Sequence, residues 1–449
     1  MSIARLVERL RARELSPREA VQSYLDRIEA TRGLNAYLSV RAEEALAEAD
    51  AAVDGPLHGV PVAIKDVIDV AGVPTTAGSE ILRHNIAVHD AEAVARLRAA
   101  GAIVLGKLNT HEFAYGALTT SPHFGPAHNP WSPDRICGGS SGGSGAAIAA
   151  DLAAGTLGTD TAGSIRIPAC YCGVTGLRPS TGLVPTRGVV TVSWTLDVVG
   201  PIARSAEDCS LLLEALAPSY RPDLAGGLTG LRIGVVEQLF ESADPAVATC
   251  VLAAVDELRS LGAAVERVEV PLLGEAGTIL QAILLPEASE VHLPWLRARL
   301  ADYGPDVRAR LLSGLLLPST SYVTGVRARR WYLDGLLPLF DRFDLLAQPT
   351  MPVAPPLIDE DTVLWNGERV PYRLSVIPYN SPWALAGAPV ASAPCGFVDG
   401  MPTGLALAGR PGGDATVLRA AAAFQRATDW HERRPDLAAA GTAVAPLPA

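Results

Sequence analysis

The sequence predicts an α/β fold in which a mixed β-sheet is covered by helices on both faces. Apolar, β-branched segments alternate with helix-like segments along the chain, which is the order that such folds require. Hydrophobic residues make up 49% of the 449 residues, enough for a large core. Charged residues make up only 19%, and this composition excludes a disordered chain, a coiled coil and a collagen-like repeat.

The first elements follow from local signals. Ser16-Pro17-Arg18-Glu19 marks a helix start, because Ser caps, Pro fits the first turn and Glu completes a capping box; the helix continues through residues 20–30. Residues 57–70 are apolar and β-branched and predict a strand with Lys65 near its end. Residues 91–100 predict a helix, which Gly101 ends before a strand over residues 102–106.

The later part of the chain repeats this order. Residues 231–236 predict a strand, residues 245–261 a helix and residues 265–270 another strand. We expect one domain over residues 1–449, with these parts: an N-terminal helical segment (1–55), a core (56–216), a linker near 217–229 and a second α/β half (230–440). The final APLPA is expected to be a frayed tail.

Charge, cysteines and hydropathy indicate a cytoplasmic protein. The net charge is −11 and there is no Lys/Arg block, which argues against direct binding of nucleic acid or of an anionic membrane. No run of 18 apolar residues and no secretion signal occurs. The six cysteines are expected to be buried free thiols. The eight histidines are scattered, so we expect no metal. We also expect no organic cofactor.

Lysine is nearly absent. Of 37 basic residues only Lys65 and Lys107 are lysine, and the other 35 are arginine. Arginine cannot give up its proton in a protein, whereas the pKa of a lysine can be lowered until it does. The two lysines are therefore the first candidates for chemistry, although a structural cation at a strand end is the simpler interpretation of Lys107.

Residues 137–188 are dominated by Gly, Ser, Thr and Ala. A flexible linker would have this composition, but residues 146–154 (AAIAADLAA) predict a buried helix and residues 156–160 a strand end, which a linker does not need. Such a segment suits a site where the backbone approaches a ligand closely. Ser164, at a Gly-rich turn, either lies beside free backbone N–H groups or caps a helix; the residues leave both open.

Two familiar motifs are rejected. Gly101-x4-Gly106-Lys107 is followed by Leu108 instead of Ser or Thr, and the residues between the glycines predict a strand, so it is no phosphate-binding loop. Gly138–Gly142 satisfies G-x-S-x-G, but the preceding HNPWSPDR predicts a loop where a nucleophile elbow needs a strand. Only His292 and His431 follow it, which disfavours a Ser-His-Asp triad.

About nine-tenths of the chain resembles the amidase signature family. The similarity is carried by GVPVAIKDVIDVAGVPTTAGS (59–79), GAIVLGKLNTHEFAYG (101–116), GGSSGGSGAA…LGTDTAGSIRIPA…CGVTGLRPSTG (138–182) and SPWALAGAPVASAPCGF…MPTGLALAGRPGGDATVLRAAAAFQ (381–425). The resemblance implies a Ser-cisSer-Lys triad with Ser164 as nucleophile, Ser140 as the bridging serine on a cis peptide bond and Lys65 as base. It also implies an oxyanion hole formed by the backbone N–H groups of Thr161, Ala162, Gly163 and Ser164.

The resemblance implies a serine amidohydrolase that cleaves small-molecule linear amides through an acyl-enzyme. Stand-alone bacterial amidases and the glutaminase (A) subunit of a tRNA-dependent amidotransferase are both similar; a non-catalytic binding protein on the same fold and an esterase are further alternatives. A homodimer or amidotransferase partner subunits are possible assemblies. Ala162 replaces a glycine of many members, and Cys137 also departs from them. Expected pocket residues are Phe113, Tyr115, Phe124, Arg308 and Tyr322.

Overall fold

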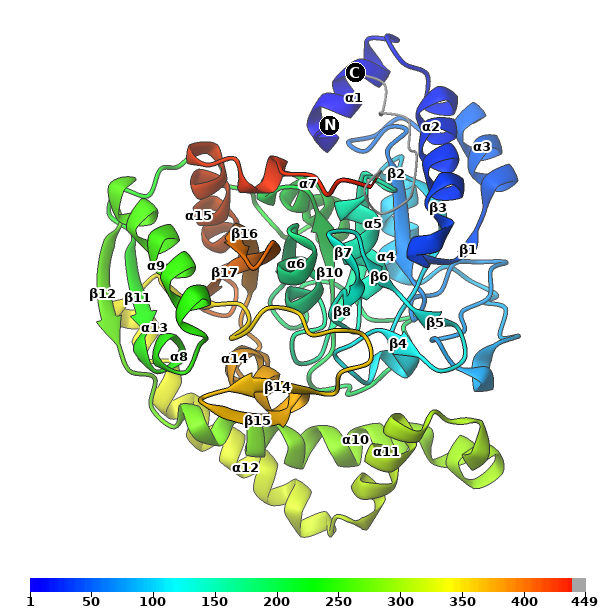
Figure 1. Cartoon of the computed structure of the whole chain (residues 1–449). Helices are drawn as coiled ribbons and strands as arrows, with labels where there is room; N and C mark the ends of the chain where they lie inside the picture. Colours follow the sequence, from blue (N-terminus) through cyan, green and yellow to red (C-terminus); the bar gives the residue numbers. More distant parts are fainter. Residues whose placement is uncertain (438–449) are drawn as a thin grey trace.

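An eleven-stranded sheet runs through the centre of the computed structural model, which describes residues 1–437 (Figure 1). The strand order is β1-β3-β2-β8-β10-β9-β16-β17-β13-β11-β12. Four neighbouring pairs are parallel (β3–β2, β2–β8, β13–β11 and β11–β12), and the others are antiparallel. The sheet is therefore mixed and flanked by helices, which confirms the predicted fold class.

The strands of the central sheet are β1 Tyr37–Val40, β2 Pro61–Lys65, β3 Ile103–Leu108, β8 Gly155–Asp160, β9 Thr175–Arg178, β10 Val198–Ala203, β11 Arg232–Val236, β12 Ala264–Val268, β13 Leu345–Pro349, β16 Val390–Val398 and β17 Met401–Gly409. Three small hairpins lie outside it: β4 Thr120–Ser121 with β5 Gly125–Pro126, β6 His128–Asn129 with β7 Ser132–Ile136, and β14 Thr362–Trp365 with β15 Glu368–Pro371.

The α-helices are α1 Ile3–Arg11, α2 Pro17–Ala30, α3 Ala42–Asp50, α4 Glu92–Ala99, α5 Gly142–Ala149, α6 Arg166–Cys172, α7 Ala206–Leu216, α8 Glu237–Glu241, α9 Pro245–Ser260, α10 Ala276–Arg299, α11 Pro305–Leu316, α12 Ser319–Leu336, α13 Leu339–Arg342, α14 Tyr372–Ala386 and α15 Asp414–Ala427. In Figure 1, α10, α11 and α12 form a layer at the bottom of the view, next to α14 and the β14–β15 hairpin. No helix in residues 1–437 is long and apolar enough to cross a membrane.

Each predicted part of the chain contributes to the same sheet. Residues 1–55 supply β1, residues 56–216 supply β2, β3, β8, β9 and β10, and the remaining strands follow residue 230. Residues 217–231 contain neither helix nor strand. The expected tail APLPA lies outside the described residues.

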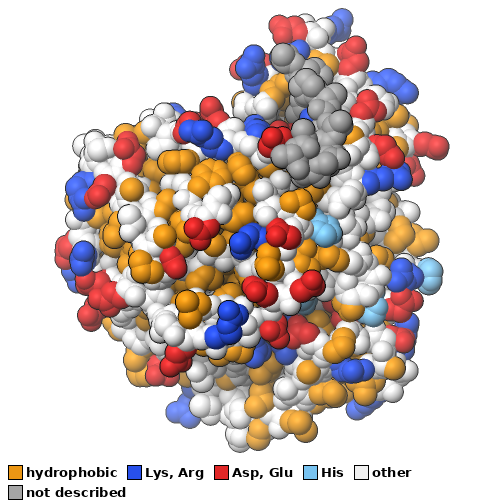
Figure 2. All heavy atoms as spheres, in the orientation of Figure 1, with side chains coloured by type: hydrophobic (Ala, Val, Ile, Leu, Met, Phe, Trp, Pro, Cys, Tyr) orange, Lys and Arg blue, Asp and Glu red, His pale blue; other side chains and the backbone are white. Residues whose placement is uncertain are grey.

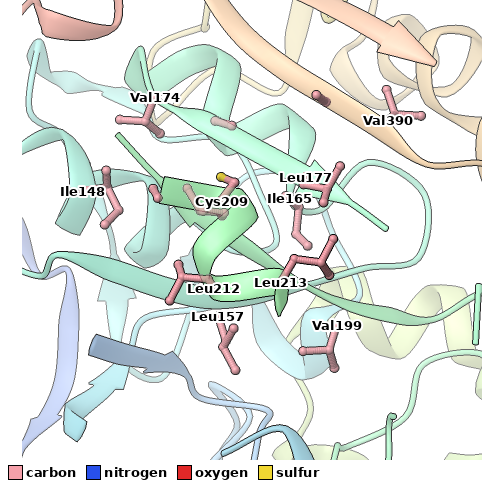
Figure 3. Close-up of a cluster of buried hydrophobic side chains, with 14 of the residues drawn as sticks. Ile148, Leu157, Ile165, Val174, Leu177, Val199, Cys209, Leu212, Leu213 and Val390 are labelled. Atoms are coloured by element: carbon pink, nitrogen blue, oxygen red, sulfur yellow. The ribbon is translucent and has the colours of Figure 1, made fainter. Parts of the chain in front are cut away.

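The core lies between the sheet and its helices. Figure 3 shows strand side chains such as Leu157, Leu177 and Val199 close to Leu212 and Leu213 of α7, and all five are fully buried. On the face in Figure 2, acidic and basic side chains are interspersed around apolar ones.

Several predicted elements are present with different bounds. The capping box at Ser16 and Glu19 starts α2 as predicted. The strand expected over residues 57–70 ends at Lys65, because the Ile68 N–H turns back to donate to the Lys65 carbonyl at 3.0 Å. The helix expected over residues 146–154 is instead α5; the apolar residues beyond it are buried without being helical.

One predicted loop is wrong. The stretch HNPWSPDR forms most of the β6–β7 hairpin, in which His128 pairs with Ile136. Its proline and asparagine made it resemble a loop, but a two-stranded hairpin outside the main sheet tolerates them. Ser140 therefore does lie between a strand, β7, and a helix, α5, although β7 is not part of the central sheet.

Candidate active site

Lys65 ends strand β2 inside the core. Its side chain is fully buried, and its Nζ lies 2.6 Å from Ser140 Oγ and 2.8 Å from Thr159 Oγ1. It forms no ion pair with any residue of the described chain. The lysine is thus surrounded by hydroxyl groups instead of a carboxylate partner, an environment in which its neutral form is accessible.

Burial lowers the pKa of Lys65 to about 7, and the more distant carboxylates of Asp160 and Asp197 oppose that shift. Removing a charge from water disfavours the ammonium form, which explains the direction. At neutral pH a large fraction of Lys65 is therefore unprotonated and able to accept a proton.

Lys107 differs from Lys65 in its partners. It is also buried, but its Nζ lies 3.0 Å from Asp66 Oδ1 and 2.9 Å from Thr75 Oγ1. Burial lowers its pKa, and the Asp66 carboxylate opposes this by favouring the charged form. Lys107 is consequently a paired structural cation.

Ser140 lies in the short connection between β7 and α5, and the Gly139–Ser140 peptide bond is cis, as the family resemblance implies. A Cβ on Gly139 would lie 2.6 Å from the carbonyl carbon of Ala117, so the neighbouring segment leaves no space for a side chain there. Ser140 itself is fully buried, with its Oγ on Lys65.

Ser164 lies in the loop between β8 and α6. The Ser141 N–H donates to the Ser164 carbonyl at 3.2 Å, which joins the two serine-containing segments. Helix α6 begins at Arg166 with Ile165 at its N-cap and has no side-chain capping bond. The capping role that the sequence left open for Ser164 is therefore absent, and its side chain lines a cavity.

Asp160 anchors the loop that carries Ser164. Its carboxylate accepts hydrogen bonds from the Gly163 N–H (2.8 Å) and the Ile165 N–H (3.2 Å), and it pairs with the buried guanidinium groups of Arg166 and Arg178. Burial alone would raise the pKa of Asp160, but the two arginines bring it below its usual range. A permanently charged aspartate thus holds the loop.

The loop leaves three of the four expected oxyanion donors free. The Gly163 N–H is engaged by Asp160, whereas the N–H groups of Thr161, Ala162 and Ser164 donate to no acceptor within residues 1–437. Asp197 accepts from Thr161 Oγ1 at 2.6 Å and holds that side of the loop. In this geometry three backbone N–H groups remain available to an oxyanion.

Ser164 and Ala162 open into a cavity of about 740 Å³. This volume lies in the range of small-molecule sites. Its walls come mainly from the segment after β3, from α10, α11 and α14, and include Ala114, Tyr115, Ala117, Leu118, Leu284, Val307, Arg310, Tyr372, Arg373 and Ile377.

Of the expected pocket residues, only Tyr115 lines this cavity. Phe113 packs against His292, Trp295 and Tyr303 in a buried aromatic cluster. Phe124 lies under the Arg83 guanidinium.

The other two expected pocket residues, Tyr322 on α12 and Arg308 on α11, do not line the cavity. Tyr322 donates to Glu287 at 3.0 Å. Arg308 is half-buried on α11, while Arg310, two residues later, stacks over the Tyr115 ring at 4.6 Å and lines the cavity.

The two family departures have different surroundings. Ala162 lines the cavity next to Ser164. Cys137 is fully buried with its Sγ 3.3 Å from the Ala127 carbonyl, so it is a packing residue. In residues 1–437 no group of three His, Cys, Asp or Glu side chains is placed to hold a metal ion.

The family model described as Amidase matches residues 19–418. The chain belongs to the amidase family. It is 38% identical to an amidase of Pseudomonas putida over 98% of this chain and 99% of that protein. It is equally 38% identical to the (A) subunit of the glutamyl-tRNA(Gln) amidotransferase of Moorella thermoacetica, over 97% and 98% of the two chains.

A solved structure is similarly close. It comes from a vestigial protein complex described as revealing the evolutionary origins of an s-triazine catabolic enzyme. The matched chain is 38% identical to this one with a TM-score of 0.90, and the match covers 95% of this chain and 98% of that chain. This family membership, confirmed over nearly the whole length, identifies the chain as an enzyme that hydrolyses amides.

Proposed function

We propose that Ser164 is the nucleophile of an acyl-enzyme mechanism, with Ser140 as proton relay and Lys65 as base. The observation that carries this proposal is the buried Lys65 Nζ, 2.6 Å from Ser140 Oγ and without a carboxylate partner in the described chain. A neutral lysine is a known substitute for histidine in serine catalysis. It also explains why the chain keeps lysine here while using arginine almost everywhere else.

Acylation begins when Lys65 takes the Ser140 hydroxyl proton as Ser140 takes that of Ser164. The Ser164 oxygen forms a bond to the amide carbonyl carbon, and the carbonyl oxygen becomes an oxyanion that the N–H groups of Thr161, Ala162 and Ser164 stabilise. When the C–N bond breaks, the amine leaves with a proton from Ser140, which regains one from Lys65. The acyl group remains on Ser164 as an ester.

Deacylation uses the same proton path, with water in the place of Ser164. Water gives a proton through Ser140 to Lys65 while its oxygen attacks the ester carbonyl. The second tetrahedral intermediate releases the carboxylic acid, and the proton returns to Ser164. No cofactor takes part in this sequence.

The proposed substrate is a small-molecule linear amide. The cavity lining combines apolar side chains and Tyr115 with charged ones, Glu112, Asp306, Arg310, Asp361 and Arg373. The apolar part suits the body of an acyl group, and the polar part suits its hydrogen-bonding end. We propose Tyr115 as an acyl-pocket residue. The net charge of −11 supports a protein that binds no nucleic acid directly. The six free cysteines support a reducing compartment such as the cytoplasm.

A second candidate function is that of a glutaminase subunit in a tRNA-dependent amidotransferase. It is favoured by the 38% identity to the amidotransferase chain of Moorella thermoacetica over nearly the full length. In that case partner subunits would assemble on this chain, whereas a stand-alone amidase would act alone or as a homodimer.

Intact-mass measurement after treatment with a fluorophosphonate tests the mechanism. The wild type should gain one adduct, which peptide mapping places on Ser164. Ser164→Ala should gain none, and Lys65→Ala should react far more slowly. An adduct that persists in Ser164→Ala would refute the assignment of the nucleophile. Hydrolysis of small amides, ureides and glutamine by the isolated chain would then separate the amidase from the amidotransferase function.

A further inference from the structure

The carbonyl oxygen of Ser140 receives hydrogen bonds from both ends of one segment. Thr110 Oγ1 lies 3.0 Å from it, the His111 N–H donates to it at 3.1 Å, and Thr119 Oγ1 lies 3.2 Å from it. Thr110 Oγ1 also lies 3.1 Å from the His111 carbonyl oxygen, so both threonines share their single hydroxyl proton with another acceptor, whereas the His111 N–H donates to the Ser140 carbonyl alone. The peptide unit that follows the bridging serine is thereby tied to residues 110–119.

Thr119 makes further contacts to the same loop. Its Oγ1 lies 2.8 Å from the Gly138 carbonyl oxygen and accepts the Gly142 N–H at 3.1 Å. Its single hydroxyl proton is therefore shared between the carbonyls of Gly138 and Ser140, while a lone pair holds Gly142. One fully buried hydroxyl spans the loop on both sides of Ser140.

The backbone of Thr119 is held in a conformation that its residue type disfavours. Its φ is +60°, and a β-branched side chain is rarely found there. Such a conformation persists when the surroundings require it, and the surroundings here are the serine loop. A Cβ on Gly142 would lie 2.5 Å from Thr119 Oγ1, so the two segments are in direct contact.

The residues between Thr110 and Thr119 form a wall of the substrate cavity. Ala114, Tyr115, Ala117 and Leu118 all line it. The same short segment thus contacts the space for substrate and, at both ends, the serine relay.

We propose that Thr119 is a positioning residue for Ser140, and that through it the cavity wall sets the position of the serine between Lys65 and Ser164. This inference rests on the proposed function. Proton transfer through Ser140 needs its Oγ within hydrogen-bond reach of both partners, and a displacement of about 1 Å costs on the order of 10²-fold in rate. Thr119 holds the peptide units on either side of that hydroxyl.

The test compares Thr119→Val, which removes the hydroxyl and keeps the shape, with Thr119→Ser, which keeps the hydroxyl. We expect Thr119→Val to lower kcat and the rate of fluorophosphonate labelling of Ser164 by about 10- to 100-fold with KM unchanged. Thr119→Ser should restore most of the rate. If Thr119→Val does not fold, Thr110→Val removes another donor to the same carbonyl and should slow labelling in the same way.

Thr175→Val is the matched control. Thr175 is equally buried, its Oγ1 donates to the Arg204 carbonyl at 3.1 Å and accepts from Gln425 Nε2 at 2.8 Å, and it lies on β9 outside the serine loop. It should cost stability without a selective loss of kcat. Equal rate losses in both variants, or wild-type labelling in Thr119→Val, would overturn the proposal.

A readout without activity separates this inference from the proposed function. Because the chain has only two lysines, ¹³C-lysine NMR shows Lys65 with Lys107 as an internal reference. Thr119→Val should lower the titration midpoint of Lys65, since its ammonium form loses a well-placed Ser140 oxygen, and leave Lys107 unchanged. An unmoved Lys65 signal contradicts the positioning role even if wild-type Ser164 proves unreactive.

Discussion

The two lysines show that burial alone does not determine what a side chain does. Both are fully buried at strand positions of the central sheet. Lys107 has a carboxylate 3.0 Å away that favours its charged form, whereas Lys65 has only hydroxyl and carbonyl oxygens near its Nζ. The difference in partners, and not in burial, makes one a structural cation and the other a candidate base.

Lys65→Arg should abolish amide hydrolysis, because a guanidinium cannot lose its proton to start the relay. In the wild type, a base with a pKa of about 7 is protonated at low pH, so kcat/KM should rise as the pH increases through about 7. The pH profile of kcat/KM measures this. Lys107→Arg, which keeps a positive charge beside Asp66, serves as the control. Its kcat/KM should rise with pH in the same way as that of the wild type. The range from about pH 6 to pH 8 covers roughly one pH unit on either side of the pKa of Lys65. A kcat/KM that does not change over this range would exclude Lys65 as the titrating group.

Asp160→Asn should unfold the protein more easily and inactivate it. The change leaves Arg166 and Arg178 buried without a counter-charge, and breaking such a pair costs about 3–5 kcal/mol. Denaturant unfolding measures the loss in the free energy of unfolding. Asp341→Asn, which breaks an exposed pair with Arg410, should cost under about 1 kcal/mol. Equal costs for the two variants would contradict the anchoring role.

At the residue scale, the sequence predicted the groups whose type is chemically unusual. Lysine scarcity pointed to Lys65, and the family resemblance added Ser140 and Ser164. Asp160 and Thr119 were missed because an aspartate or a threonine in such a segment is ordinary, and their roles depend on partners such as Arg178 that only folding brings close. A signal for Asp160 did exist, because it is one of only two acids, with Asp151, in residues 137–188, a segment with few charged residues.

At the element scale, the β8–α6 loop is shaped by one glycine. Gly163 has a φ of +121°, and a Cβ there would lie 2.7 Å from the side chain of Asn380 on α14. Gly163→Ala should therefore displace the loop and slow labelling of Ser164 by on the order of 10²-fold.

Gly182→Ala is the control for this prediction. Gly182 also has a positive φ, +82°, but nothing lies within 4 Å of its Cβ position. It should lose about 1 kcal/mol of stability and keep its labelling rate. The test is to measure the rate of Ser164 labelling in both folded variants side by side. An unchanged rate in Gly163→Ala would contradict the prediction, because the loop would then tolerate the added methyl group.

Several elements were predictable although their bounds were not. The helix near residue 150 was expected from its alanines, yet α5 starts at Gly142, because the glycines pack against Thr119 and Asn109 where larger side chains would not fit. The layer of α10–α12 that walls the cavity was not predicted, since its prolines at 286 and 294 break the helical pattern. Which side chains of α11 and α12 face the cavity depends on how this layer packs, so the sequence could not show that Arg308 and Tyr322 do not line it.

At the scale of the whole molecule, the central sheet joins segments that are distant in sequence. The β9–β16 pairing places Leu177 opposite Ala391, and β1 adds the N-terminal segment through Tyr37 and Leu108. The loop anchored on β8 and the cavity wall from α11 lie on opposite sides, in the sequence, of residues 217–231, which contain neither helix nor strand. The candidate site is therefore assembled only when both parts of the chain fold together.

This continuity predicts one cooperative unfolding transition. Trp194 lies in the first part of the chain and Trp383, fully buried on α14, in the second; Trp131 is unsuitable because it packs against Phe397 of β16. Single-tryptophan variants retaining one or the other should give coincident denaturant curves, since no sheet edge separates the parts. Cleavage engineered at residues 221–227, an exposed stretch without helix or strand, should yield fragments that stay associated and separate only on unfolding. Two distinct transitions would mean that the parts are independent domains, and that the site lies at an interface between them.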